Sequence, residues 1–148
     1  MSRCQSMTTT EQKKLVSDFI RRYSTAVLAT VSPETKAEAA VITFAINDDF
    51  EVIFQTFPPY RKYRNLKNNP SAAFVFGWDE KITVQYEGLA YEIKEEDLMQ
   101  HKEVYFAQNP ATLKWDEVLD AAWFKVSPKW VRYLNNTEPR TIHEITFP

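Results

Sequence analysis

Glycine occurs at only two positions in this chain of 148 residues, Gly77 and Gly88. Proteins use glycine at about 7% of positions on average, so backbone conformations that require it are scarce here. The glycine-rich phosphate loops GxGxxG and GxxxxGK[ST] cannot be assembled from two isolated glycines. A nucleotide or phosphate bound by this protein must therefore be held by side chains and by the N-terminus of a helix.

The charge and the few metal-ligating residues exclude further classes of protein. Lysine and arginine number 18 and aspartate and glutamate 20, and the net charge of −2 gives no general attraction to nucleic acid or anionic membranes. With only His101, His143 and Cys4, the HExxH and paired CxxC metal motifs are absent. No apolar run approaches the ~18 residues of a membrane span, and one cysteine cannot form an internal disulfide. We expect a cytoplasmic protein with no nucleic-acid, membrane or metal partner.

The first half of the chain is predicted to form a helix and then strands. The length fits a single domain over 1–148, with residues 1–7 as a loose leader. Thr8 and Glu11 match a capping box, which predicts that a helix begins there. Apolar runs predict strands over 26–31, 40–46 and 51–56, with Asn47-Asp48-Asp49 as the hairpin turn between the last two.

The second half alternates two helical segments with strands. The predicted elements are a short helix over 60–67, strands over 72–76 and 81–93, a helix over 94–108 and a last strand over 121–134, interrupted near Ser127-Pro128. Gly88, inside the long strand, indicates a bulge or a close approach of two backbone segments. Six short, antiparallel-looking strands with little glycine predict a mainly β fold with flanking helices, a small barrel rather than a parallel sheet.

A basic pair opens the predicted helix that follows the third strand. Arg61 and Lys62 stand in its first turn, where the positive end of the helix dipole normally favours aspartate or glutamate. A bound phosphate would remove this conflict, because free backbone N–H groups, a guanidinium and an ammonium would all converge on it. A solvated basic helix face is the alternative, and local spacing alone favours that alternative.

The segment QTFPPYRK, from Gln55 to Lys62, followed by NLKNNP at 65–70, resembles the pyridoxamine 5′-phosphate oxidase-like family of flavin-binding split barrels. In that family a strand ends in threonine, a short linker leads to arginine or serine and then lysine, a helix follows, and Asn-Pro opens the next strand. The order of the flanking strands is also similar, and the resemblance covers roughly residues 20–93. It implies a six-stranded antiparallel split β-barrel of the FMN-binding type.

The resemblance also implies a cofactor, a site and a partner. Seven positions match the family's FMN contacts: Arg61 and Lys62 at the phosphate, Thr56 and Gln55 at the strand end beside it, Ile42 and Thr43 along the isoalloxazine ring, and Thr83, matched across a one-residue gap. Family members are homodimers with the flavin between subunits. The implied protein is an FMN-dependent oxidoreductase that passes a hydride through flavin N5, with NAD(P)H as one candidate electron donor and no identified catalytic acid or base.

Two departures separate the chain from the authentic oxidases. Ala40 stands where those enzymes have an arginine that contacts the phosphate, and the segment 131–136 lacks their Arg-x-His pattern. The tail over 124–132 resembles instead the last strand of small, general-stress-protein-like members. The alternatives are a module that holds flavin, haem or the deazaflavin F420 without turnover, and a barrel whose site is degenerate and empty.

Overall fold

The computed structural model describes residues 7–148, so the predicted leader over 1–7 lies outside the described residues except for Met7. The helices are α1 (Thr9–Ile20), α2 (Arg61–Asn68), α3 (Glu95–Gln108) and the 3-10 helix η1 (Pro110–Trp115). The predicted cap of α1 is confirmed, because the Thr8 hydroxyl accepts a hydrogen bond from the Glu11 backbone N–H at 3.2 Å. No helix within 7–148 is long and apolar enough to span a membrane.

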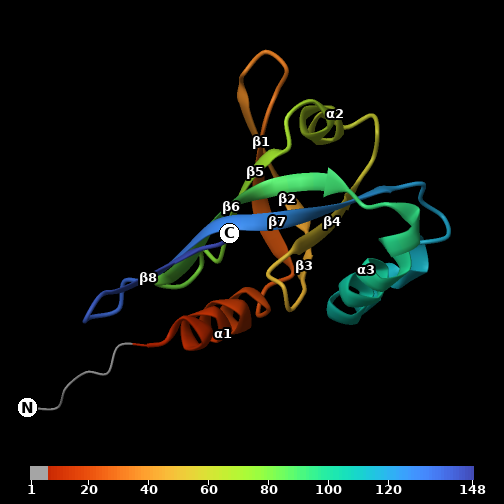
Figure 1. The fold of residues 1–148 in the computed structure, drawn as a ribbon. Coiled ribbons are helices and arrows are strands. Elements are labelled where there is room, and N and C mark those ends of the chain that lie inside the picture. The colour runs from red at the N-terminus through yellow and green to blue at the C-terminus, as the bar shows by residue number, and fades with distance from the viewer. Residues whose placement is uncertain (1–6) are drawn as a thin grey trace, which may run out of the picture.

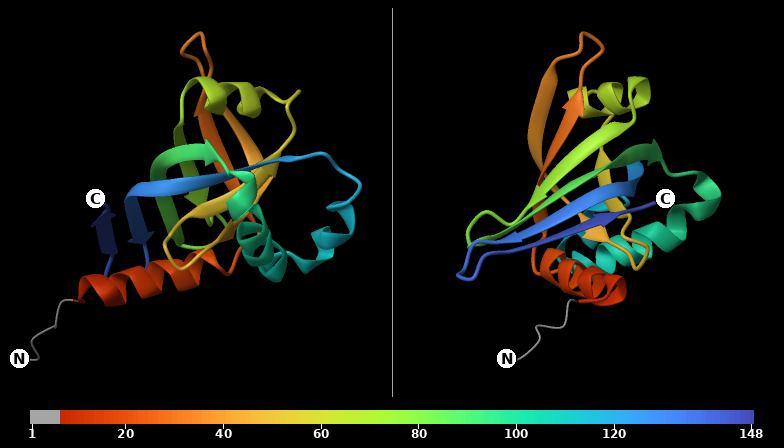
Figure 2. Two further views of the ribbon diagram at one scale, coloured as in Figure 1. Left: turned by 45° about the vertical axis from the view of Figure 1, so that its right-hand side comes forward. Right: turned by 60° about the vertical axis from the view of Figure 1, so that its left-hand side comes forward.

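The strands form one antiparallel sheet, in the order β2-β1-β5-β6-β7-β4-β3, with β8 added beside β7. They are β1 (Thr25–Val31), β2 (Ala37–Thr43), β3 (Ala45–Ile46), β4 (Val52–Thr56), β5 (Ser71–Phe76), β6 (Ile82–Glu92), β7 (Ala122–Asn135) and β8 (Thr141–Thr146). Because β2 and β3 adjoin in the chain yet stand at opposite ends of this order, the sheet curls round on itself (Figures 1 and 2). The predicted fold class, a mainly β split barrel with flanking helices, is confirmed.

The sheet has eight strands rather than the predicted six, for two reasons. The predicted strand over 40–46 divides at Phe44, whose N–H donates to the Ser24 carbonyl at 3.1 Å and whose carbonyl accepts from the Asn109 side chain at 2.8 Å. The chain therefore passes from one end of the sheet order to the other at this residue. The sequence prediction also misses β8, a largely exposed edge strand whose only ladder in the described chain is with β7.

Gly88 confirms the predicted close approach of two backbone segments. The register of β6 against β7 shifts between Glu87 and Gly88, where Gly88 stands opposite Pro128. A Cβ at position 88 would overlap the Ser127 carbonyl oxygen. The predicted interruption of the last strand at this point is wrong, because β7 continues through Pro128 and the bulge accommodates a residue that has no N–H to donate.

Aromatic side chains fill the interior of the curled sheet. Fully buried rings come from β4, β5, β6 and β7 and from the β2–β3 junction: Phe44, Phe54, Phe74, Phe76, Tyr86 and Phe124. The Phe54 and Phe124 rings stack with their centroids 5.6 Å apart, and so do the rings of Phe74 and Phe76. Burying one such ring contributes about 1.5–3 kcal/mol, so this core holds the surrounding strands in fixed positions.

Replacing Tyr86 with phenylalanine is expected to lower the free energy of unfolding by about 1–3 kcal/mol, the cost of leaving a buried carbonyl without a donor. The Tyr86 hydroxyl lies 2.6 Å from the Phe50 carbonyl and 3.0 Å from that of Val126, and its burial raises the pKa of Tyr86. Urea denaturation measures the change. The control is Tyr23→Phe, which removes an exposed bond to Asp79 and should cost less than about 0.5 kcal/mol. Equal costs for the two variants would contradict this account.

Candidate functional site

Four residues separate the end of β4 at Thr56 from the start of α2 at Arg61, so the helix begins one residue later than the sequence predicts. The linker turns through a hydrogen bond of 2.9 Å from the Tyr60 N–H to the Phe57 carbonyl, and α2 starts at Arg61. The N-cap residue Tyr60 supplies no side-chain cap, and the first turn contains no acidic residue. Within residues 7–148, the backbone N–H groups of Arg61 and Lys62 have no hydrogen-bond partner in the protein. The start of α2 is therefore an uncapped, positive helix end, suited to an anion.

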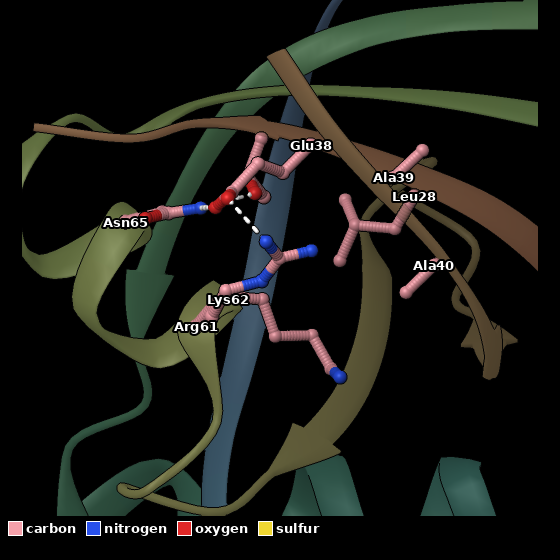
Figure 3. Close-up of a pocket in the computed structure, with 8 residues that line it drawn as sticks. Leu28, Glu38, Ala39, Ala40, Arg61, Lys62 and Asn65 are labelled. Carbon is pink, nitrogen blue, oxygen red and sulfur yellow. Dashed lines mark hydrogen bonds and ion pairs between the residues drawn. The ribbon is translucent and has the colours of Figure 1, made fainter. Parts of the chain in front are cut away.

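A small cavity of about 100 Å³ lies between α2 and the neighbouring strands β1 and β2 (Figure 3). Its walls are Leu28, Thr30, Glu38, Ala39, Ala40, Arg61, Lys62 and Asn65. Leu28 pairs with Ala40 and Thr30 with Glu38 across the β1–β2 ladder, so these four side chains share the face that is turned to α2. We call this space the α2 cavity. Both cations of the predicted phosphate site line it.

Lys62 is the cation of the α2 cavity without a counter-charge. No carboxylate in the described chain lies within 4.0 Å of its ammonium, which sits 5.0 Å from the centre of the Tyr60 ring. Partial burial lowers the pKa of Lys62, because removing water disfavours the charged form. An anion placed beside Lys62 would offset that cost, so the site is electrostatically prepared for one.

Arg61 already has a partner, which the sequence prediction does not include. Its Nη1 lies 2.7 Å from Oε2 of Glu38, whose side chain is only 16% exposed while that of Arg61 is 69% exposed. Asn65 Nδ2 donates to the other Glu38 oxygen at 2.7 Å and to the Thr30 hydroxyl at 2.9 Å. The signal in the sequence is the alternation of Glu38, Ala40 and Ile42, which places the glutamate on the inner face of β2.

A second cavity of about 250 Å³ lies beside the α2 cavity, and Lys62 lines both. It is bounded by the ends of β2 and β4, the β4–α2 linker, α3 and η1: Val41, Ile42, Thr43, Gln55, Thr56, Phe57, Tyr60, Lys62, Tyr105, Thr112, Trp115 and Leu119. We call it the ring cavity. The structure thus brings six of the seven predicted site residues to two adjacent cavities. The buried Thr56 hydroxyl has no hydrogen-bond partner in the described chain, as expected of a group that awaits a polar ligand atom.

Thr83 is the predicted site residue that the fold does not bring to this place. It lies on β6 opposite Leu134 and lines neither cavity. Strands β1 and β5 separate β6 from β2 in the sheet. Within one chain, Thr83 therefore cannot act together with the other six residues.

The outer wall of the ring cavity comes from α3 and η1, which the sequence prediction does not connect with the site. The Gln108 side chain accepts a hydrogen bond from the Ile46 N–H at 3.1 Å and donates one to the Ile46 carbonyl at 2.8 Å. The amide thus makes the pair of bonds that a neighbouring strand would make. These bonds fix the end of α3 and so place Trp115 and Tyr105 at the cavity. Burial raises the pKa of Tyr105, opposed by the nearby Gln55 and Thr112 side chains, so its phenol stays protonated at neutral pH. No local pattern in the sequence signals this long-range pairing.

Comparisons with known proteins agree with this fold. The chain superposes on a haem binding protein from Mycobacterium smegmatis with a TM-score of 0.77 and 15% identity, covering 96% of this chain and 60% of that one. It superposes on Campylobacter jejuni ChuZ with a TM-score of 0.78 and 15% identity, covering 95% and 61%. For General Stress Protein 26 from Bacillus anthracis the TM-score is 0.69 and the identity 21%, covering 90% and 98%.

These structural likenesses establish the fold, and the sequence establishes the family. No curated protein matches the sequence. The family model described as pyridoxamine 5′-phosphate oxidase matches residues 12–135, which include α2, both cavities and all seven predicted site residues. The chain belongs to the pyridoxamine 5′-phosphate oxidase family.

Proposed function

We propose that this protein binds FMN in the two adjacent cavities and acts as a flavin-dependent oxidoreductase. The observation that carries the proposal is Lys62, a partly buried ammonium without a carboxylate partner in the described chain, at the uncapped start of α2. A half-buried cation beside free helix N–H groups is costly unless an anion binds there. The phosphate of FMN supplies that anion.

The residues of the two cavities fit the parts of FMN. Arg61 and Lys62 would hold the phosphate, and the unpartnered Thr56 hydroxyl with the Gln55 amide would bind polar groups next to it. Ile42 and Thr43 would lie along the flavin ring, with apolar contact from Trp115 and Leu119 on the far side of the cavity. Ala40 leaves the α2 cavity without the third cation that the authentic oxidases use, so the grip on the phosphate depends on these two side chains.

The ionisable side chains that line the ring cavity are compatible with hydride transfer, a reaction that need not use a catalytic acid or base. Bound FMN would supply the two-electron redox chemistry, while the protein binds, orients and shields it. Among the residues that the structure describes, Lys62, Tyr60 and Tyr105 are the only ionisable side chains that line the ring cavity, and none of the described carboxylates or histidines is placed there as a base. The proposal includes NAD(P)H as the electron donor and the cytoplasm as the compartment.

A homodimer is part of this proposal. On the outer face of the sheet, Val41, Val27 and Val75 are cross-strand neighbours in one row, and Gln85 continues it on β6. Val41 is 63% exposed and Val75 36%, so this apolar row is available to a second subunit. Thr83 shares that face with Gln85 and would meet the flavin of the other chain. Sedimentation at micromolar concentration tests this, and a monomer in the presence of FMN would contradict it.

Haem is the second candidate, because a haem binding protein is among the structural neighbours. Histidine, cysteine, methionine or tyrosine usually binds haem iron from the protein side. The ring cavity offers only Tyr60 and Tyr105 of these, and Tyr105 is buried. The Lys62 ammonium suits the phosphate of FMN and a carboxylate of haem equally, so the scarcity of iron ligands in the lining is what makes haem the second candidate.

Anaerobic mixing of the FMN-loaded protein with NADH or NADPH tests the proposed activity. We expect the visible flavin band to bleach and to return when air is admitted. If the flavin stays oxidised with both nucleotides, the protein is a flavin carrier and not an oxidoreductase that uses NADH or NADPH. Uptake of haem or deazaflavin in preference to FMN would overturn the cofactor assignment, and refusal of all three would indicate a degenerate site.

A further inference from the structure

Glu38 places a negative charge inside the proposed phosphate site. One oxygen of its carboxylate lies 2.7 Å from Arg61 Nη1, and the other accepts the hydrogen bond of 2.7 Å from Asn65. Figure 3 shows the Glu38, Arg61 and Asn65 side chains converging at the edge of the α2 cavity, with Lys62 reaching further along it. A bound phosphate would therefore meet an arginine that is already paired.

The position of Glu38 is fixed by its surroundings. Asn65 is completely buried, and the same Nδ2 that binds Glu38 also donates to the Thr30 hydroxyl at 2.9 Å. Thr30 stands directly opposite Glu38 in the β1–β2 ladder. Moving the carboxylate out of the cavity would leave a buried amide N–H without its acceptor, which is unfavourable. The glutamate stays in place, and the exposed Arg61 is the partner that can move.

The charges of the site do not balance those of a phosphate monoester. Arg61 and Lys62 contribute two positive charges and Glu38 removes one, whereas a phosphate monoester carries about −1.5 to −2 at pH 7. The ligand phosphate must therefore compete with Glu38 for the Arg61 guanidinium and bear the repulsion of the carboxylate. Riboflavin, which has no phosphate, experiences neither effect.

We propose that Glu38 is a specificity-determining residue that competes with the ligand phosphate for Arg61 and so keeps FMN exchangeable. The inference rests on the proposed function, because it concerns the same phosphate site. Lys62, without a carboxylate partner in the described chain, then provides most of the phosphate binding. Glu38 lowers the preference of the site for FMN over riboflavin without touching the flavin ring.

Titration of the full-length protein with FMN and with riboflavin, followed by flavin fluorescence, tests the role of Glu38. Glu38→Gln keeps a carbonyl acceptor for Asn65 and removes the charge, so FMN affinity should rise about tenfold while riboflavin affinity stays within about twofold. Glu38→Thr, which also removes the carboxylate and has a side chain suited to a strand, should likewise raise the affinity for FMN and leave the affinity for riboflavin within about twofold. The matched control is Glu92→Gln, which breaks an ion pair of 3.0 Å with Lys67 on α2 outside both cavities and should change neither affinity.

The outcomes separate this inference from the proposed function. If both variants bind both flavins with the wild-type ratio of affinities, Glu38 does not set the preference and the inference is wrong. Equal strengthening of FMN and riboflavin would also overturn it, since the effect would not act through the phosphate. If neither the wild type nor a variant takes up any flavin, the proposed function fails and the inference fails with it.

Discussion

Removing both cations of the α2 cavity, in the double variant Arg61→Ala, Lys62→Ala, is expected to weaken FMN binding by at least about a hundredfold. Hydrogen bonds to charged groups contribute about 1.5–3 kcal/mol each, and the double variant loses those of both side chains. It also removes the Arg61 guanidinium that lies 2.7 Å from the Glu38 carboxylate, so this carboxylate would face the phosphate without its ion-pair partner. Riboflavin binding should change little. Fluorescence titration with both flavins measures the difference.

Lys67→Ala is the control for this double variant. Lys67 is on the same helix but pairs with Glu92 at 3.0 Å and lines neither cavity. Its loss should leave both flavin affinities unchanged. The assignment of the phosphate site would be untenable if the double variant bound FMN as well as the wild type, or if it lost FMN and riboflavin equally.

Gly88→Ala is expected to lower the free energy of unfolding by on the order of 3 kcal/mol or more. An added Cβ would overlap the Ser127 carbonyl oxygen and lie 2.8 Å from Val126 Cγ1. Both obstacles belong to β7, which β6 contacts through its longest ladder. The backbones must separate at the bulge to admit the methyl group, which strains the centre of the sheet. Urea denaturation gives the change in the free energy of unfolding.

The neighbouring substitution Glu87→Ala separates the steric effect from a general effect of position. Glu87 is exposed and precedes the register shift, so its replacement should cost less than about 0.5 kcal/mol. A Gly88→Ala variant as stable as Glu87→Ala would mean that the approach of the two strands is not as close as described.

The parts of the site that the sequence predicts are those encoded by neighbouring residues. Thr56 ends a strand, a proline-containing linker follows, and Arg61 opens a helix, so one continuous segment carries the side chains that we propose bind the phosphate. The hairpin turn at Asn47 is local in the same way, since its Oδ1 accepts from the N–H groups of Asp49 and Glu51. Such short-range signals predict most helix and strand positions to within one or two residues.

The parts that the sequence does not predict depend on pairing between distant segments. Glu38 meets Arg61 only because the β1–β2 ladder and α2 pack together, and Trp115 reaches the ring cavity only because Gln108 binds the backbone of Ile46. Thr83 illustrates the converse: a position that matches the family in the sequence lies away from the cavities in one chain. Register and sheet order decide these contacts, and neither is readable from one segment alone.

Equilibrium dialysis of the wild-type protein against FMN and against riboflavin, read by visible absorbance, tests whether Lys62 and Arg61 at the start of α2 hold the phosphate of a flavin. The predicted result is saturable uptake of FMN, with riboflavin bound more weakly and inorganic phosphate displacing FMN but not riboflavin. FMN uptake no tighter than that of riboflavin, or no uptake of either, would contradict the account.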